Sequence, residues 1–557
     1  MISRRKFINS ASLTSAAAVA MPQLFYSSLF QKTPEYVTVE ITHGKIRGER
    51  TEGVNIFRGI PYGGKISGDR RFRRPAALEP WAGVRDALRL GNPAIQPPNQ
   101  TYGLNEPDPA EDCLFLNVWT PANDNKKRPV MFYNHGGGFS TGSGGSTSQD
   151  GANLARFFDV VVVETNHRLG IMGFLFLDNI AGSDYTGSGN NGMLDISDGL
   201  AWVNKNIASF GGDPSNVMIF GESGGGAKTS CLYAMPAAAP YFNKASIESG
   251  PGVRMTARDV AAQTTAMLLK ELNIDKKDWR KLLDVPVQTL LEMQGKLPSL
   301  APRPAGHNKK RGLMESAPGS FSPVVDGLAL PDHPFDPVAP AISKDKPLII
   351  GWNEDEFTFF GMMSNDKSIF SVDFNGLPEK LKPQFGDDTQ KIINTYRETR
   401  PDASAVDILV AIKSMNMMGL GSIVIAERKT EQNEAPAYLY NLGYKSEVLI
   451  PGTDYPLGSP HVLDISFKFN NEQPLKDGSP GKSHWAGAKP ERFIASRNMA
   501  ELWTTFARTG KPAAKNAPEW PAYDLKDRSS MRIDTNCSVI NDRYYEELRM
   551  WRETGRL

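Results

Sequence analysis

Three short apolar runs, each followed at once by a glycine-rich turn, constrain the fold of this chain more than any other feature. Val130–Tyr133 precedes His-Gly-Gly-Gly, Val160–Thr165 precedes Asn-His-Arg-Leu-Gly, and Val217–Phe220 precedes Gly-Glu-Ser-Gly-Gly. Short β-branched runs bounded by glycine, with helical stretches such as Leu200–Ile207 between them, are typical of parallel strands covered by helices. We therefore predict an α/β fold with a mostly parallel central sheet and helices on both faces.

The rest of the chain extends this pattern without repeating it. Alternating apolar residues between positions 36 and 47 predict strands of a meander at one edge of the sheet. Helical periodicity predicts two helical insertions, at Thr256–Gln294 and Ala403–Glu427. Apolar runs predict two later strands, at Pro347–Gly351 and Tyr438–Leu442. No period of about 20–50 residues recurs, which argues against solenoids and propellers. We expect one large domain over residues 32–557, with helical insertions rather than separate domains.

Composition excludes several classes of protein. The chain has 63 Lys and Arg against 62 Asp and Glu, so its net charge of +1 creates no field that attracts nucleic acid. Its 51 glycines and 40 prolines among 557 residues lie well below the content of low-complexity chains. Its 3 cysteines cannot form a disulfide framework or a zinc site by spacing. The composition is that of a large globular α/β protein with no nucleic-acid partner.

The N-terminus is typical of an export signal. Arg4–Phe7 form a basic start before the small apolar stretch Ala11–Ala20, an arrangement that resembles a twin-arginine signal. A stretch of about ten residues is too short to span a bilayer, and no later run reaches 18 apolar residues, so no membrane insertion is expected. We assign residues 1–31 to this signal and expect a periplasmic or secreted protein. Cleavage after Ala18–Ala20 or further on stays open, and an accidental basic start on a cytosolic protein is the alternative.

The segment Gly221–Gly225 contains the candidate nucleophile. It matches G-x-S-x-G between an apolar run and a stretch of small residues, which is the strand–turn–helix context that gives this motif its meaning. The sharp turn raises one hydroxyl above the sheet, and glycines two positions before and after it avoid collisions of side chains. We predict Ser223 as the nucleophile.

A second glycine-rich turn, His135–Phe139, follows a strand upstream of that serine. Acyl transfer builds negative charge on a carbonyl oxygen, and backbone N–H groups aimed at it lower the barrier by about 3–4 kcal/mol per donor. A phosphate-binding glycine loop is the alternative, but it requires a Lys followed by Ser or Thr, which are absent here. The pair of turns therefore favours acyl transfer over nucleotide binding.

With these two turns in place, the chain resembles the carboxylesterase type-B family, the cholinesterase-like branch of the α/β-hydrolases. Further segments are similar to family signatures and follow in the family's order: Glu111–Val118, Asn166–Gly170, Phe210–Pro214, Phe321–Gly327 and Phe506–Gly510. The resemblance covers nearly the whole chain after the signal. It implies an α/β-hydrolase fold and a serine carboxylesterase that acts on small-molecule esters without metal or cofactor.

The family's triad acid is a glutamate in a turn after a strand. The resemblance places Glu356 in that role, after the strand that ends at Gly351. Phe357 stands where the family usually has glycine, so Glu354 and Asp355 remain alternatives.

The base follows from chain order together with the resemblance. Triads on this fold run serine, acid, histidine, which leaves His461 and His484 among the seven histidines. The loop Gly458–Ile465 is similar to the family's histidine loop and favours His461, whereas His484 is expected to be a surface or packing residue. His461 then takes the proton of Ser223, and Glu356 holds the imidazole. The expected oxyanion donors are the backbone N–H groups of Gly137, Gly138 and Gly224.

One departure from the family concerns the cysteines. Ala94 stands where the family often places the disulfide partner of Cys113. We therefore expect free thiols with no catalytic role at Cys113, Cys231 and Cys537.

A second departure concerns substrate class. The family's choline-binding Trp has no counterpart near Gln100–Leu104, where only Tyr102 is aromatic. The Gly-Gly-Gly-Phe turn resembles the type associated in this family with bulky alcohol groups. We expect neutral short-to-medium acyl esters, including aryl and bulky alcohols, to be preferred over choline esters. A lipase of the same family, hydrolysis of amides, carbamates or thioesters, and a non-catalytic binding module are the alternatives.

Overall fold

The computed structural model describes residues 35–98, 106–301, 317–472 and 485–557. The predictions for the signal at residues 1–31, for Tyr102 and for His484 lie outside these residues.

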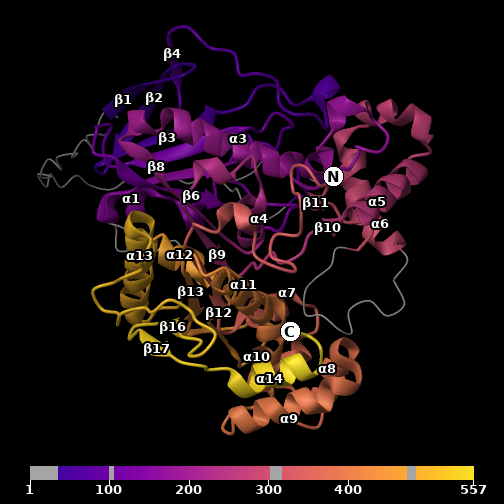
Figure 1. Ribbon diagram of the computed structural model, residues 1–557, viewed down its shortest axis with the longest axis vertical. Helices are drawn as coiled ribbons and strands as arrows, with labels where there is room; N and C mark the ends of the chain where they lie inside the picture. The colour runs from indigo at the N-terminus through magenta and orange to yellow at the C-terminus, as the bar shows by residue number, and fades with distance from the viewer. Residues whose placement is uncertain (1–34, 99–105, 302–316, 473–484) are drawn as a thin grey trace, which may run out of the picture.

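A sheet of 13 strands runs through the centre of the molecule (Figure 1). Its order is β1-β2-β3-β5-β7-β6-β8-β9-β12-β13-β16-β17, and β4 pairs with β2. The strands of this sheet are β1 Glu35–Ile41, β2 Gly44–Thr51, β3 Val54–Pro61, β4 Val84–Asp86, β5 Phe115–Thr120, β6 Arg128–Asn134, β7 Val161–Thr165, β8 Gly212–Glu222, β9 Lys244–Glu248, β12 Leu348–Asn353, β13 Ala437–Leu442, β16 Ser530–Ile533 and β17 Ser538–Ile540. Two small sheets pair β10 Thr256–Ala257 with β11 Val324–Val325, and β14 Ser446–Leu449 with β15 Pro456–Gly458.

The middle of the large sheet is parallel and its edges are antiparallel. Strands β7, β6, β8, β9, β12, β13 and β16 pair in parallel, whereas β1, β2, β3 and β5 form an antiparallel edge and β17 closes the other end. Ligand sites of open α/β sheets lie beyond the carboxyl ends of the parallel strands. The turns after β6, β8 and β12 leave from that edge, so the fold brings together three segments that are far apart in sequence.

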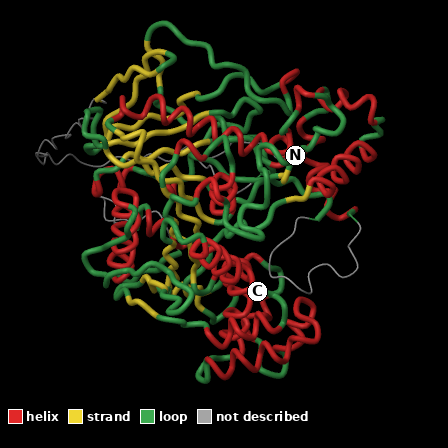
Figure 2. The backbone as a smooth tube through the Cα atoms, in the orientation of Figure 1, coloured by secondary structure: helices red, strands yellow, loops and turns green. Residues whose placement is uncertain are grey.

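Helices cover both faces of this sheet, as Figures 1 and 2 show. They are α1 Ala152–Phe158, α2 Gly170–Phe174, α3 Asn191–Asn206, α4 Gly224–Ala234, α5 Arg258–Glu271, α6 Val287–Leu300, α7 Glu356–Met363, α8 Leu377–Phe385, α9 Thr389–Thr399, α10 Ala405–Ser414, α11 Leu420–Glu431, α12 Leu463–Lys468, α13 Glu491–Thr509 and α14 Tyr545–Glu553.

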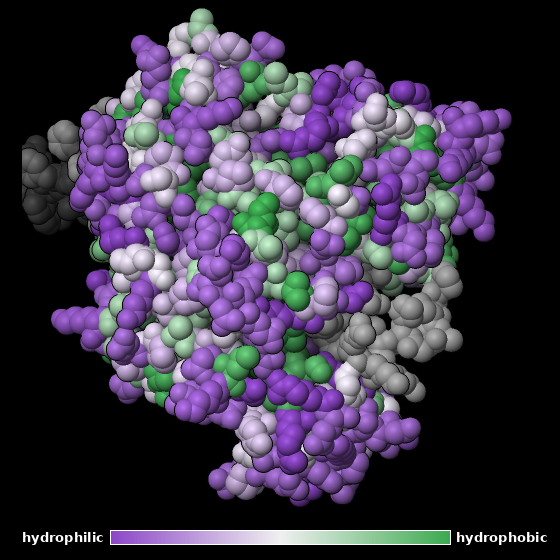
Figure 3. All heavy atoms as spheres, viewed as in Figure 1, coloured by the Kyte–Doolittle hydropathy of each residue, from purple (hydrophilic) through white to green (hydrophobic). Residues whose placement is uncertain are grey.

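Alternate residues of the central strands enter two different cores. Phe132 and Ile219 pack with α3, α4 and α11 on one face, whereas Met131 and Phe220 pack with α1, α12 and α13 on the other. This alternation follows from the strand period of two residues and produces the two-faced layering predicted from the apolar runs. Outside these cores, the face shown in Figure 3 is mostly hydrophilic, with apolar residues gathered over its middle.

The helical insertions differ in detail from the sequence expectation. The segment predicted as helical from Thr256 opens with the two-residue strand β10, which pairs with β11, before α5 begins. The second insertion is one long helix from Ala405 to Glu431, in which a π-turn joins α10 to α11. By length and composition this helix can cross a membrane, but 72% of its most apolar window is buried inside the protein. Burial of that extent is what a core helix of a globular protein shows.

Candidate active site

Ser223 lies in the sharp turn between β8 and α4. Its backbone has φ 59° and ψ −123°, in the positive-φ region that residues other than glycine rarely adopt. The Ser223 N–H donates to the carbonyl of Glu248 at 2.9 Å, which ties the turn to the end of β9. Strain of this kind costs about 1–3 kcal/mol and persists where the surroundings determine it. The strand–turn–helix context predicted from the motif is present.

Close packing explains the glycines around this serine. A Cβ on Gly225 would lie 1.9 Å from the carbonyl oxygen of Asn134, and a Cβ on Gly221 would lie 2.6 Å from the same oxygen. A Cβ on Gly224 would lie 2.3 Å from the backbone nitrogen of Gly138. No side chain fits at these distances, so the turn can meet the end of β6 and the next loop only with glycine at all three positions.

The structure brings together the three predicted triad residues. His461 Nε2 lies 2.9 Å from Ser223 Oγ, and His461 Nδ1 lies 2.5 Å from Glu356 Oε2. Both His461 and Glu356 are buried. The second oxygen of Glu356 accepts a hydrogen bond from the backbone N–H of Asn353 at 2.7 Å, which fixes the carboxylate. The arrangement is a continuous path of hydrogen bonds from hydroxyl to imidazole to carboxylate.

The two rival acids lie in a different environment. Glu354 forms ion pairs with Arg543 and Lys445 rather than with the histidine. Asp355 accepts the backbone N–H of Ser459 at 2.7 Å and pairs with Lys445. Asp355 therefore ties the acid turn to the histidine loop, and of the three consecutive acids only Glu356 contacts the imidazole.

Besides Glu356, a second carboxylate faces the imidazole, and the sequence motifs do not single it out. Glu222 Oε1 lies 3.3 Å from His461 Nε2, and Glu222 is buried. Burial lowers the pKa of His461, but the carboxylates of Glu222 and Glu356 outweigh it and raise that pKa to about 9. Burial raises the pKa of Glu222 to about 8. Glu222 therefore stabilises the imidazolium form of His461. In the sequence, the one indication of this role is that Glu222 stands next to the serine, at the end of a buried strand.

A buried ionic cluster connects elements on which these residues lie. Lys468 Nζ pairs with Glu248 at 2.7 Å and with Asp464 at 2.9 Å, and all three side chains are fully buried. Burial lowers the pKa of Lys468, but Asp464 and Glu248 outweigh it and raise the value. Asn353 donates to Asp464 at 3.1 Å, which connects the end of β12 to α12 just beyond the histidine. The cluster thus joins α12, just beyond the histidine, to the ends of β9 and β12.

The predicted oxyanion loop lies against the serine turn. Gly137 and Gly138 have φ 85° and 62°, a conformation that favours glycine. Beside Gly138 the space is open, since a Cβ there would meet no atom within 4 Å. The loop therefore contacts Gly224 closely on one side and leaves room for another molecule beside Gly138.

Aromatic side chains form one wall beside the histidine. The rings of Phe359 and Phe360, from the helix that begins with Glu356, lie 5.8 and 4.8 Å from the His461 ring. Trp485 packs against Phe359 at 6.0 Å between ring centroids. An apolar wall of this kind suits an uncharged organic group.

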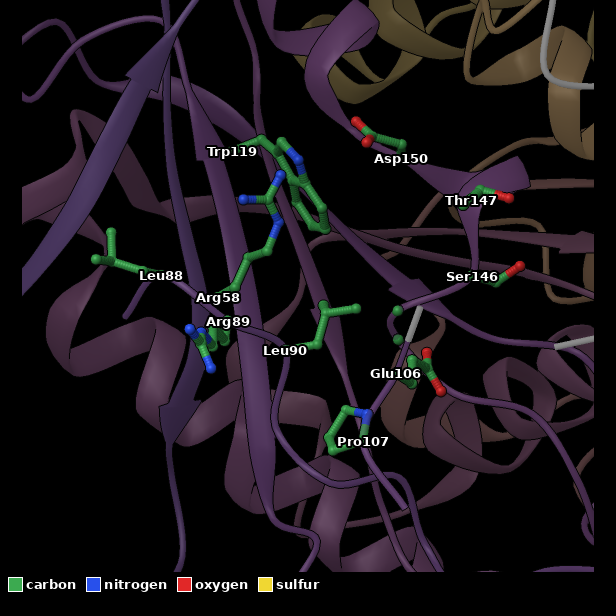
Figure 4. Close-up of a pocket in the computed structure, with 12 residues that line it drawn as sticks. Arg58, Leu88, Arg89, Leu90, Glu106, Pro107, Trp119, Ser146, Thr147 and Asp150 are labelled. Atoms are coloured by element: carbon green, nitrogen blue, oxygen red, sulfur yellow. The ribbon is translucent and has the colours of Figure 1, made fainter. Parts of the chain in front are cut away.

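A cavity of about 520 Å³ lies elsewhere, and no triad residue lines it. Figure 4 shows its lining, with Arg58 and Trp119 on one side and Thr147 and Asp150 on the other. Gly144–Thr147, which follow the glycine loop, help to line it, whereas Ser223, Glu356 and His461 do not. In the described part of the chain, no group of three or more His, Cys, Asp or Glu side chains is arranged to hold a metal ion.

All three cysteines are free thiols in the structure, as the sequence predicts. Cys113 and Cys231 are buried and Cys537 is half-buried. Burial raises the pKa of each thiol, which disfavours the reactive thiolate.

Comparison with known proteins decides the family. The sequence profile of the Carboxylesterase family matches residues 35–551. The chain belongs to the carboxylesterase family. The para-nitrobenzyl esterase of Bacillus subtilis (strain 168) is 32% identical over 521 residues, which cover 92% of this chain and 97% of that protein. The phenmedipham hydrolase of Pseudarthrobacter oxydans is 29% identical over 518 residues, which cover 90% of this chain and 96% of that protein.

Solved structures agree with this assignment. A carboxylesterase of Geobacillus stearothermophilus matches with a TM-score of 0.76 at 33% identity, covering 92% of this chain and 99% of that chain. An esterase of Clostridium hathewayi described as hydrolysing aliphatic aromatic polyesters matches with a TM-score of 0.75 at 28% identity, covering 94% and 100%. The predicted family, the α/β-hydrolase fold and the class of enzyme are confirmed: this carboxylesterase is a carboxylic ester hydrolase.

Proposed function

We propose that this carboxylesterase is a serine esterase that hydrolyses neutral carboxylic esters through an acyl-enzyme. The observation that carries the proposal is the path of hydrogen bonds from Ser223 Oγ through His461 to Glu356, at 2.9 and 2.5 Å. The strained serine turn and the glycine loop beside it support the same chemistry. No cofactor enters the proposed reaction.

In the first half-reaction the Ser223 hydroxyl attacks the ester carbonyl carbon. His461 Nε2 takes the hydroxyl proton as the new C–O bond forms, and then gives it to the alcohol oxygen as the ester bond breaks. Glu356 holds Nδ1–H and stabilises the imidazolium that exists between these two events. The products of this half-reaction are free alcohol and an acyl group on Ser223.

In the second half-reaction water replaces the alcohol. His461 removes a proton from water as the water oxygen bonds to the acyl carbon. The bond between that carbon and Ser223 Oγ then breaks, the carboxylic acid leaves, and His461 returns the proton to Oγ. In both halves the negative charge on the carbonyl oxygen is stabilised by backbone N–H groups. We assign these to Gly137, Gly138 and Gly224, where the loop and the serine turn meet.

The substrate class that we propose is neutral esters with aryl or bulky alcohols and short-to-medium acyl groups. Phe359 and Phe360 form an uncharged aromatic wall beside His461. A structural relative is described as acting on aliphatic aromatic polyesters, and a sequence relative is a para-nitrobenzyl esterase. A series of p-nitrophenyl esters of increasing acyl length distinguishes this esterase from a lipase, which would prefer long chains.

The nucleophile is tested by Ser223→Ala beside a matched control. Ser422 is a buried serine in α11 whose hydroxyl has no hydrogen-bond partner among the described residues, so Ser422→Ala should leave turnover unchanged. Ser223→Ala should retain the circular dichroism spectrum and lose about 10⁶-fold in kcat. Turnover of Ser223→Ala within tenfold of the parent enzyme would show that another group is the nucleophile.

We also propose that the enzyme is exported to the periplasm or beyond by the twin-arginine route. The support is the basic Arg4–Phe7 start and the short apolar stretch after it. Replacing Arg4 and Arg5 together by lysine should leave active enzyme in the cytoplasm of an expressing bacterium. Equal periplasmic activity of parent and variant contradicts the proposal.

A further inference from the structure

A buried lysine lies beneath the oxyanion loop and has no part in the triad. Lys228 follows the nucleophile by five positions on α4 and is fully buried. Its Nζ donates to the carbonyl oxygen of His135 at 2.8 Å, and among the described residues it forms no ion pair with a carboxylate. Burial lowers the pKa of Lys228 to about 7.

Fold stability does not account for this residue. Removing an amine from water without an acidic partner is costly, and one neutral carbonyl offsets only part of that cost. Methionine has similar length and fills such a site without the cost of removing a charge from water. The hydrogen bond that Lys228 donates is therefore the feature that a methionine at this position would lack.

The hydrogen bond from Lys228 acts on the chain just before the proposed oxyanion donors. His135 O belongs to the peptide that enters Gly136. The His135 ring in turn contacts Gly136 O through Nδ1 at 2.9 Å, and since a carbonyl oxygen only accepts, Nδ1 carries the hydrogen. That Gly136 carbonyl belongs to the same peptide as the Gly137 N–H. Two side chains thus fix two successive peptides, and the second presents an oxyanion donor.

The surroundings prevent these peptides from turning independently. The loop wraps the His135 ring so closely that a Cβ on Gly142 would lie 2.4 Å from its Nδ1. The His135 ring also stacks on the His167 ring, with 4.6 Å between the ring centroids and an interplanar angle of 23°. A shift of the His135 carbonyl is therefore transmitted to Gly137 and Gly138 rather than absorbed by rotation of the ring.

We propose that Lys228 is a positioning residue that holds the His135–Gly138 peptides in the orientation that presents their N–H groups to the developing oxyanion. This inference rests on the proposed acyl-transfer function. Lys228 acts through the loop and does not touch the substrate.

The test compares Lys228→Met with a matched control, Lys244→Met. Lys244 is also a buried lysine whose pKa burial lowers, to about 8, and it contacts the neutral Asn216 side chain. It lies at the start of β9, the end of the strand away from the serine turn. Both variants are assayed for Tm, kcat and KM. They are also assayed for inhibition by two compounds of the same shape: a trifluoromethyl ketone, which forms a tetrahedral anion on the serine, and the matching amide, which does not.

Lys228→Met should lower kcat about 10–100-fold and weaken the trifluoromethyl ketone in parallel, a loss typical of one misplaced charge-assisted hydrogen bond. KM and amide affinity should change less than about threefold, Tm should be unchanged or higher, and Lys244→Met should keep kcat. Lys228→Gln, which retains a neutral donor, should fall between parent and Lys228→Met. It also serves as the test variant if the methionine variant does not fold.

Two results overturn this inference. One is a kcat within threefold of the parent enzyme in the folded variant. The other is a loss of kcat that leaves the affinity for the trifluoromethyl ketone unchanged and follows a fall in Tm. Failure of the proposed function itself is separable, because Ser223→Ala would then remain active whatever happens at Lys228.

Discussion

Replacing Glu222 by Gln should move the pH dependence of the enzyme to lower pH. Glu222 Oε1 lies 3.3 Å from His461 Nε2, the nitrogen that must be unprotonated to accept the serine proton. The carboxylate stabilises the imidazolium and contributes to raising the His461 pKa to about 9. Rate should therefore rise with pH through that pKa in the parent enzyme and through a lower value in Glu222→Gln.

The size of the shift follows from the distance. At an effective dielectric constant of about 20, two unit charges at the 3.3 Å separation interact by about 5 kcal/mol, an upper limit near 3–4 pKa units. Glu222 itself has a pKa of about 8, so it is largely ionised at about pH 9, where the histidine titrates. We expect the midpoint to fall by about 1–2 units, since glutamine keeps the shape but removes the charge.

The assay is kcat/KM for p-nitrophenyl butyrate between pH 5.5 and 10, corrected for spontaneous hydrolysis, because this ratio reports the free enzyme. Glu547→Gln is the matched control: Glu547 is also buried, but it pairs with Arg400 and not with the histidine. The control should keep the parent midpoint. A Glu222→Gln midpoint equal to or above that of the parent refutes the electrostatic role given to Glu222.

Three further outcomes are expected. Glu356→Gln should lower kcat about 10⁴-fold, because the amide no longer stabilises the imidazolium. Glu354→Gln, which alters an ion pair outside the triad, should keep kcat within about threefold; equal losses in the two variants would reopen the assignment of the acid. Thiol titration in denaturant without reductant should find Cys113, Cys231 and Cys537 all free, and a count of one would reveal a disulfide. Acetylcholine should be a poorer substrate than its uncharged isostere 3,3-dimethylbutyl acetate, and a higher kcat/KM for the charged ester would disclose a cation site.

Local sterics made the serine turn and its strands predictable. The run Val130–Tyr133 lies within β6, and Val217–Phe220 lies within β8. The start of β8 could not be read from the apolar run, because the strand begins at Gly212 and includes the polar stretch 213–216, where the register with β6 shifts. Apolar periodicity reports burial, and a polar part of a strand carries no such signal.

Tertiary contacts decided what the sequence left open. Glu354, Asp355 and Glu356 are consecutive, and only the packing of β12 against the histidine loop determines which of them meets the imidazole. The same loop contains a feature that the motif did not indicate. Val462, directly after His461, has φ 70°, which is strained for a β-branched residue.

The buried charged groups were harder to foresee than the triad. Lys228 lies in a segment of small and apolar residues after the nucleophile, and Glu222 lies at the end of a buried strand. A charged residue among small and apolar residues is unusual for a buried segment, and this contrast can be seen in the sequence. Its meaning depends on which atoms it reaches, which only the fold supplies.

The central claim is that Ser223 is the nucleophile, and covalent labelling tests it most directly. The enzyme is titrated with a fluorophosphonate, residual esterase activity is followed, and the modified peptide is located by mass spectrometry. We expect one adduct per chain on Ser223, with loss of activity in proportion to labelling and no labelling of Ser223→Ala. An adduct on another residue, or full activity after complete labelling of Ser223, contradicts it.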